Sequence, residues 1–106
     1  MIPHAYRDFI YKLISATETN EVSWEEIDPK SFICRREKVT ATISHYFNDD
    51  TEKLYYYFNY HNIVNGNKAG FGISSDDEDF ETMDRLFDAS NANAYNIEDE
   101  LSDFFE

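Results

Sequence analysis

The residues that could do covalent chemistry are few and isolated in this chain. Cys34 is the single cysteine among 106 residues, and Arg35 and Arg36 would lower the pKa of its thiol if the side chain were exposed. With His45 or His61 and a carboxylate it would make a conceivable hydrolytic set, whereas a cysteine on an apolar strand is more often a small buried side chain. The sequence has no glycine-rich phosphate loop, Gly-x-Ser-x-Gly or His-Glu-x-x-His pattern. We therefore expect a protein that is not an enzyme and needs no cofactor.

A run of acidic residues is the feature that suggests a metal. Carboxylates alternate at Asp77, Asp79 and Glu81, as oxygen ligands do in a calcium loop. An EF-hand loop also needs glycine at its sixth position and glutamate at its twelfth, and the windows that begin at Asp77 and at Asn91 do not supply both. The run is better explained as the solvated first turn of a helix, so no metal site is expected.

Charge is distributed unevenly along the sequence. Residues 1–73 carry ten acidic and eight basic side chains, whereas residues 74–106 carry twelve acidic side chains and the single base Arg85. The last third therefore holds nearly all of the formal net charge of −13. Such a negative field repels phosphate, which argues against direct binding of nucleic acid and of anionic membranes.

The composition fits a single folded domain over residues 1–106. Nine Phe, eight Tyr and one Trp provide enough large apolar side chains for a core in spite of the acidity. Apolar runs are far shorter than the roughly 20 residues that span a bilayer, and charged residues interrupt the first fifteen positions, where a secretory signal would lie. A cytoplasmic location is expected, and the lone cysteine excludes an internal disulfide.

The N-terminal third predicts a helix followed by a turn. Apolar side chains recur with helical period over residues 3–17, which predicts a helix there. Ser23 and Glu26 have the spacing of a capping box, which predicts a short helical turn over residues 23–28.

The middle of the sequence alternates as β-strands do. Apolar and polar side chains alternate over residues 38–47, 54–62 and 69–74, and residues 32–35 indicate a short fourth strand. One turn is expected at Asp50-Thr51, and a two-residue type I′ turn at Asn65-Gly66. The pairs that follow are Phe47–Leu54, Ile43–Phe58 and Ala41–Tyr60 in the first hairpin, and Tyr60–Phe71 and Phe58–Ile73 in the second.

These registers keep one face of the sheet apolar across three strands, which predicts an antiparallel meander. They place His45 opposite Tyr56 and His61 opposite Thr40, on opposite faces of the sheet. The strand histidines therefore cannot converge, with His4 or without it, on a transition metal.

The C-terminal third predicts two helices. Ser75 and Glu78 form a capping box before an apolar stripe, which predicts a helix over residues 76–90. Residues 91–95 are a polar break, and the apolar side chains after Asn96, a candidate cap, again repeat with helical period. The expected fold is an α+β domain with an N-terminal helix, a three- to four-stranded antiparallel meander and two C-terminal helices packed on one sheet face.

The polar face of the predicted sheet is rich in tyrosine. Tyr46, Tyr55 and Tyr57 lie on it among threonine, serine and asparagine. Strand propensity accounts for tyrosines on an ordinary solvated face, but tyrosine is also enriched at recognition surfaces because it offers rigid amphipathic area. If all the helices pack on the other face, this one is open to a partner.

The composition resembles that of small acidic immunity proteins, antitoxins and phage-encoded inhibitors. A protein that grips nucleic acid presents a basic cleft, into which a dense carboxylate surface is steered. The first hypothesis is a non-catalytic protein that neutralises a basic, nucleic-acid-handling protein, in the extreme case as a DNA mimic. The alternative is a structural or assembly subunit, such as a homodimer, that self-associates through the tyrosine face or a Phe104-Phe105 edge. The candidate partner-binding residues are Asp76, Asp77, Asp79, Glu81, Asp84, Asp88, Glu98, Asp99, Asp103, Tyr46, Tyr55 and Tyr57.

Overall fold

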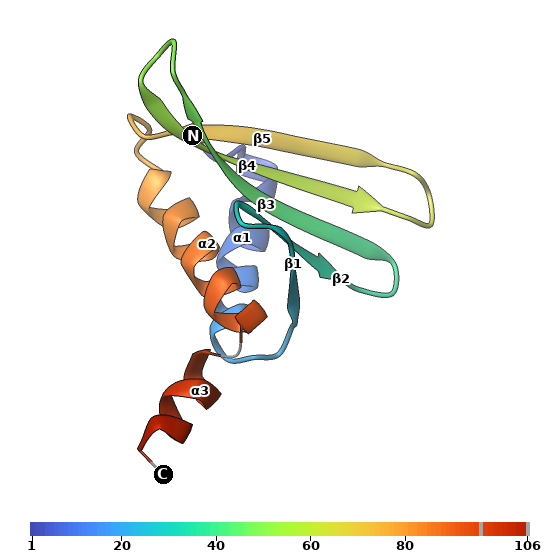
Figure 1. The fold of residues 1–106 in the computed structure, drawn as a ribbon. Coiled ribbons are helices and arrows are strands. Elements are labelled where there is room, and N and C mark those ends of the chain that lie inside the picture. Colours follow the sequence, from blue (N-terminus) through green and yellow to red (C-terminus); the bar gives the residue numbers. More distant parts are fainter. Residues whose placement is uncertain (96, 106) are drawn as a thin grey trace.

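An antiparallel sheet of five strands forms the centre of the fold (Figure 1). The computed structural model describes the backbone of residues 1–95 and 97–105, and the side chains of residues 1–95 and 101–105. In chain order the elements are α1 (His4–Glu18), β1 (Trp24–Asp28), β2 (Ser31–Arg35), β3 (Val39–Asn48), β4 (Lys53–Asn62), β5 (Lys68–Ser74), α2 (Phe80–Tyr95) and α3 (Ile97–Phe104). Each strand pairs with the next one along the chain. The predicted α+β meander is confirmed, with five strands instead of three or four.

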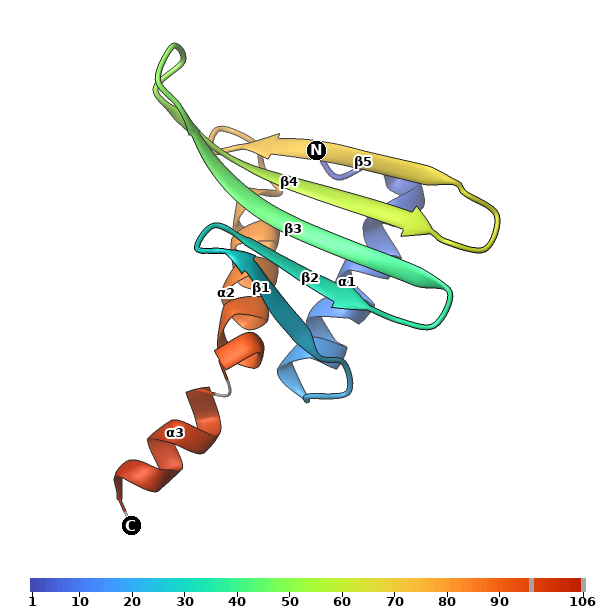
Figure 2. The same ribbon diagram turned by 45° about the vertical axis from the view of Figure 1, so that its right-hand side comes forward.

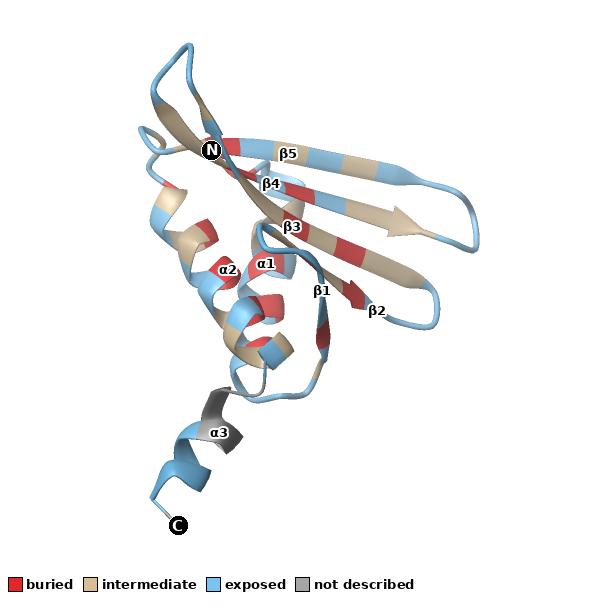
Figure 3. Cartoon of the chain, in the orientation of Figure 1, coloured by how far each residue is buried: buried red, intermediate tan, exposed pale blue. Residues whose placement is uncertain are grey.

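Helices α1 and α2 lie side by side on one face of the sheet (Figure 2). The buried residues, red in Figure 3, gather where these helices face the strands. The apolar stripes of both helices meet the alternate inward-facing positions of the strands, as the periodicities require. The core is formed by Ile10, Leu13, Ile14, Met83, Leu86 and Phe87 from the helices, and by Trp24, Phe32, Ile43, Tyr56, Phe58 and Ile73 from the strands.

The β3–β4 hairpin has the predicted register. Ile43 lies opposite Phe58 and Ala41 lies opposite Tyr60. In the loop, the side-chain oxygen of Asn48 accepts hydrogen bonds from the backbone N–H groups of Asp50 and Thr51, at 2.9 and 3.1 Å. An asparagine at the strand end therefore stabilises the turn that this register needs.

The predicted register of the β4–β5 hairpin was wrong by two residues. Phe71 lies opposite Phe58 and not opposite Tyr60. The reason is the side chain of Asn62, which accepts hydrogen bonds from the N–H groups of Val64 and Asn65 and so opens a five-residue loop instead of a two-residue turn. Because side chains alternate with a period of two, the shift leaves every residue of β5 on its predicted face.

The predicted helical turn over residues 23–28 was also wrong, because this segment is strand β1. Trp24 lies opposite Cys34 on β2, and its side chain is 3% exposed. Its backbone N–H donates to the side-chain oxygen of Asn93 on α2. Burial of the indole and pairing with β2 override the local capping pattern. Strand β2 confirms the short strand indicated at residues 32–35.

Helix α2 begins and ends later than predicted. The Ser75–Glu78 capping box does not form; the Asp77 carboxylate instead accepts the N–H of Asp79 at 2.8 Å, and the helix begins at Phe80. Residues 91–95, predicted to be a break, belong to this helix. Their helical conformation is held from outside, because the Asn93 amide also donates to the carbonyl of Val22 at 2.9 Å.

Helix α3 follows α2 and extends away from the sheet (Figure 1). Of the two C-terminal helices, α2 therefore covers the strands, and α3 adjoins the end of α2. The predicted cap Asn96 lies outside the described residues.

Candidate partner-binding surfaces

An acidic groove runs between the end of α1 and the outer face of α2. Glu81, Asp84 and Asp88 occupy positions i, i+3 and i+7 of α2, so they share one side of the helix. With Glu18 of α1 they line a groove of about 670 Å³ that also includes Arg85. Partial burial and, secondly, the negative charge of Asp84 raise the pKa of Asp88. Asp84 and Asp88 are thus close enough to repel each other, and a cationic partner would relieve this repulsion.

Arg85 does not neutralise this groove. Its guanidinium pairs with Glu18 through two hydrogen bonds, at 2.7 and 2.9 Å, across two helices. These bonds lower the pKa of Glu18 and raise that of Arg85. The one base of the C-terminal third is therefore matched by an acid from the N-terminal third, and the three carboxylates of α2 keep their charge excess.

Asp84 is anchored from the sheet below it. The hydroxyl of Tyr56, a residue only 2% exposed, donates a hydrogen bond to the Asp84 carboxylate. Burial, reinforced by this bond, raises the pKa of Tyr56. Asp84 is half-buried, whereas Glu81 and Asp88 are exposed, so the two flanking carboxylates are the ones a partner reaches first.

Removing the Tyr56 hydroxyl should therefore cost stability. We expect Tyr56→Phe to lower the free energy of unfolding by about 1.5–2 kcal/mol, the lower part of the range for a hydrogen bond to a charged group, because Asp84 is only half-buried. Above pH 10 the Tyr56 hydroxyl keeps its proton in the folded wild type and loses it in the unfolded chain. The free energy of unfolding therefore falls as the pH rises above 10, and Tyr56→Phe removes this contribution of Tyr56. Urea titrations at pH 7 and pH 10.5 measure both effects. Tyr46→Phe, whose ring is 49% exposed, is the matched control, and an equal loss in both variants would contradict the role of the buried bond.

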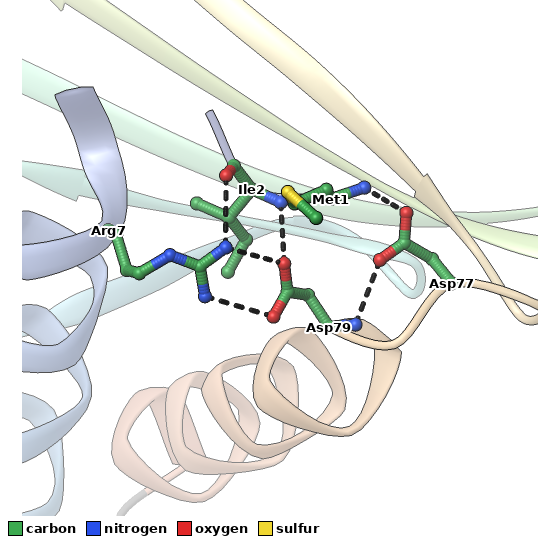
Figure 4. Close-up of polar contacts among 5 residues, drawn as sticks. All are labelled: Met1, Ile2, Arg7, Asp77 and Asp79. Carbon is green, nitrogen blue, oxygen red and sulfur yellow. Dashed lines mark hydrogen bonds and ion pairs between the residues drawn. The ribbon is translucent and has the colours of Figure 1, made fainter. Parts of the chain in front are cut away.

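The acids before α2 lie elsewhere and serve the fold (Figure 4). Asp79 is 7% exposed. Its carboxylate accepts hydrogen bonds from both terminal nitrogens of the Arg7 guanidinium, at 3.0 and 2.9 Å, and from the backbone N–H of Ile2, at 2.8 Å. These bonds lower its pKa, with the Arg7 bond contributing most. Asp77 accepts the amino group of Met1. This cluster ties the beginning of α1 to the beginning of α2, so Asp79 is not available to a partner.

The remaining predicted acids are spread over separate elements. Asp76 is exposed and pairs with Lys53 of β4 at 2.5 Å. Asp103 is exposed on α3. Glu98 and Asp99 also belong to α3, where only their backbone is described. The predicted acidic set is therefore divided among the groove, the start of α2 and α3.

The three predicted tyrosines do lie together, on the sheet face opposite α1 and α2. The rings of Tyr55 and Tyr57 stack with centroids 6.1 Å apart, and the ring centroids of Tyr46 and Tyr57 are 6.4 Å apart. Gly72 of β5 leaves room for this cluster, because a Cβ atom there would lie 2.9 Å from the Tyr57 ring. We call Tyr46, Tyr55 and Tyr57 the tyrosine face. Since α2 covers the opposite side of the sheet, the acidic groove and the tyrosine face point in different directions.

The hydrolytic set conceived around Cys34 does not assemble. Cys34 is 2% exposed, and burial raises the pKa of its thiol despite the charge of Arg36. It pairs with Ala41, which lies four residues, or about 13 Å, along β3 from His45. His45 stacks on Phe87 with ring centroids 4.7 Å apart, and His61 lies on the opposite sheet face, as the register predicted.

Within residues 1–95 and 101–105, whose side chains are described, no cluster of three His, Cys, Asp or Glu residues could hold a metal ion.

Sequence reasoning missed Glu18 as a groove residue. It stands 67 positions before Arg85, on a helix whose acids carry no distinctive pattern. The available signal was the isolation of Arg85 among twelve acids, which made a partner for it expected.

Fold and surfaces together define a small α+β domain in which a five-stranded meander carries helices on one face and a tyrosine cluster on the other. No family model matches the chain, and neither the curated proteins nor the solved structures contain a match. None of the described helices is long and apolar enough to cross a membrane.

Proposed function

We propose that the protein is a non-catalytic, cytoplasmic inhibitor that binds a basic, nucleic-acid-handling protein and neutralises it, as an immunity protein, antitoxin or phage-encoded inhibitor does. The observation that carries this proposal is the acidic groove. Three of its carboxylates sit on α2, which is packed against the sheet, and its one arginine is already paired with the fourth, Glu18 of α1. The groove therefore presents preorganised negative charge.

Preorganised charge favours rapid association with a cationic cleft. Glu81 and Asp88 are separated by about 10 Å along the helix axis, so a row of negative charge faces outward. A partner shaped to hold a phosphate backbone offers a complementary row of lysine and arginine side chains. Electrostatic steering raises such association rates by tenfold or more at low salt and is lost as salt screens the charges.

Affinity capture from the lysate of the native host, at about 50 mM and about 500 mM NaCl, tests the proposal. We expect the wild-type protein to retain a basic, nucleic-acid-handling protein at low salt and to lose most of it at high salt. In the variant Glu81→Gln/Asp88→Asn, the association rate with the captured protein should fall about tenfold, because two exposed groove charges are lost.

The matched control is Asp49→Asn/Asp50→Asn in the β3–β4 loop. It removes the same two charges at exposed positions away from the groove. Retained binding in the control together with lost binding in the groove variant supports the inhibitor proposal. Equal binding by both variants would contradict the role assigned to the groove.

Self-association is the second candidate function, favoured by the contacts among the tyrosines. Tyr46 and Tyr57 are 49% and 39% exposed and lie side by side on a sheet face that no described helix covers. A contact made by these rings buries apolar area and is insensitive to salt. Recovery of nothing but the protein itself at both salt concentrations would favour this function over inhibition.

A further inference from the structure

Helix α3 carries an apolar face that nothing in the described chain covers. Leu101, Phe104 and Phe105 are 60%, 80% and 86% exposed. Leu101 and Phe104 share one side of α3, and the ring of Phe105, which directly follows the helix, contacts the ring of Phe104 with centroids 5.0 Å apart. A cluster of large apolar side chains that are exposed to solvent is typical of a protein interaction site.

A second uncovered apolar surface lies on the body of the domain. A groove of about 440 Å³ opens between α1 and the neighbouring ends of β2, β3 and β4. We call it the apolar groove. Its lining is almost entirely apolar, and Leu13, Cys34 and Ala41 are buried side chains within it. The other lining residues are Phe9, Lys12, Ala16, Val22, Arg36, Val39 and Tyr60.

The charges beside these two surfaces are opposite. Lys12 and Arg36 are the charged residues of the apolar groove, and both are exposed. Residues 97–106 of the sequence contain five acids and no base. In a chain of net charge −13, an apolar groove bordered by two cations is suited to an acidic amphipathic helix.

We propose that α3 of one copy binds in the apolar groove of a second copy, with the exchange made reciprocally in a dimer. The direction of α3 favours a second copy as the occupant, because the helix extends away from its own body (Figure 2). Leu101, Phe104 and Phe105 supply the apolar contact, and Lys12 and Arg36 face the acids of the helix. Reciprocal exchange fills both grooves and closes the assembly with two-fold symmetry.

Sedimentation equilibrium of the full chain across a concentration series tests the helix side of this contact. We expect the wild type to dimerise and Phe104→Ser/Phe105→Ser to raise the dimer dissociation constant at least tenfold. Tyr46→Ser/Tyr57→Ser tests the competing contact through the tyrosine face: it removes the same number of exposed rings, and if α3 makes the dimer contact it should leave the constant within twofold. A monomeric wild type, or a dimer broken by the tyrosine variant and not by the phenylalanine variant, would overturn the proposal.

Complementation tests the groove side. Lys12→Glu/Arg36→Glu reverses the two exposed groove charges and should also raise the dissociation constant at least tenfold. Mixed with Phe104→Ser/Phe105→Ser, it should form a heterodimer, because its intact α3 meets the other variant's intact groove. A homodimer of either variant has both of its α3–groove contacts disrupted, whereas the heterodimer keeps one intact α3–groove contact. Absence of a heterodimer would overturn the exchange, since docking of α3 in its own groove or pairing through the tyrosine face predicts no such rescue.

Discussion

Replacing Phe58 by alanine is expected to lower the free energy of unfolding by about 3–5 kcal/mol, the usual cost of deleting a buried aromatic ring. Phe58 is 1% exposed and lies at the centre of β4. Its ring contacts Phe71 on β5 and Phe9 on α1, with centroids 5.6 and 6.1 Å away. Because a domain of this size is stable by only about 5–15 kcal/mol, the variant should lose a large share of its stability.

Urea denaturation followed by the fluorescence of Trp24, the single tryptophan, measures this loss. The matched control is the next residue in the chain. Tyr57→Ala removes a ring of similar size from the opposite face, where 39% of it is exposed, and should cost less than about 1 kcal/mol. A larger loss for Tyr57→Ala than for Phe58→Ala would contradict the assignment of the two faces.

The faces of the sheet could be predicted from the sequence because they follow from alternation alone. Ile43 and Phe58 face each other in the structure as the pattern required. The register of β5 could not be obtained in this way, since the Asn65-Gly66 pair favours a two-residue turn and the bonds accepted by the Asn62 side chain oppose it. The turn preference of Asn65-Gly66 and the hydrogen bonds accepted by Asn62 thus compete, and the conformation of the whole loop decides which of them prevails.

The helix boundaries depended on contacts between distant parts of the chain. Asn93 is locally typical of a helix break, yet its side chain makes two hydrogen bonds with residues about 70 positions away. Its amide nitrogen donates to the carbonyl of Val22, and its amide oxygen accepts the backbone N–H of Trp24. These contacts both extend α2 and hold β1 in place. Patterns of neighbouring residues give no sign of contacts between such distant positions. The predicted turn at residues 23–28 and the predicted break at residues 91–95 were therefore both wrong, for the same reason.

The same distinction applies to the candidate surfaces. The sequence made Glu81, Asp84 and Asp88 candidate partner-binding residues together with Asp79, and the structure places the first three on one side of α2. The sequence could not distinguish them from Asp79, which is buried against Arg7, 72 positions earlier. A dense acidic run therefore contains two kinds of carboxylate, and only the structure separates those that face solvent from those that hold the fold.

Asp79→Asn should show that the buried kind is structural. The substitution keeps the shape of the side chain but places an amide N–H₂ against the Arg7 guanidinium, which also can only donate. We expect the free energy of unfolding at pH 7 to fall by about 2–3 kcal/mol, as for the loss of charged hydrogen bonds at a buried site. Asp76→Asn is the matched control, because Asp76 is 65% exposed in its pair with Lys53 and should contribute less than about 1 kcal/mol.

The pH dependence of this difference identifies its cause. The bond from Arg7 holds the pKa of Asp79 below its ordinary value of 3.8, so the folded state releases the proton more readily than the unfolded state does. A depressed carboxylate pKa stabilises the fold fully above the unfolded pKa, and this contribution disappears as the pH falls through the folded pKa. The gap in stability between the wild type and Asp79→Asn should therefore be constant from pH 7 to about pH 5 and narrow steadily below pH 4. A gap that stays constant down to pH 2 would show that the asparagine disturbs packing, and that the ion pair with Arg7 is not what secures α1 to α2.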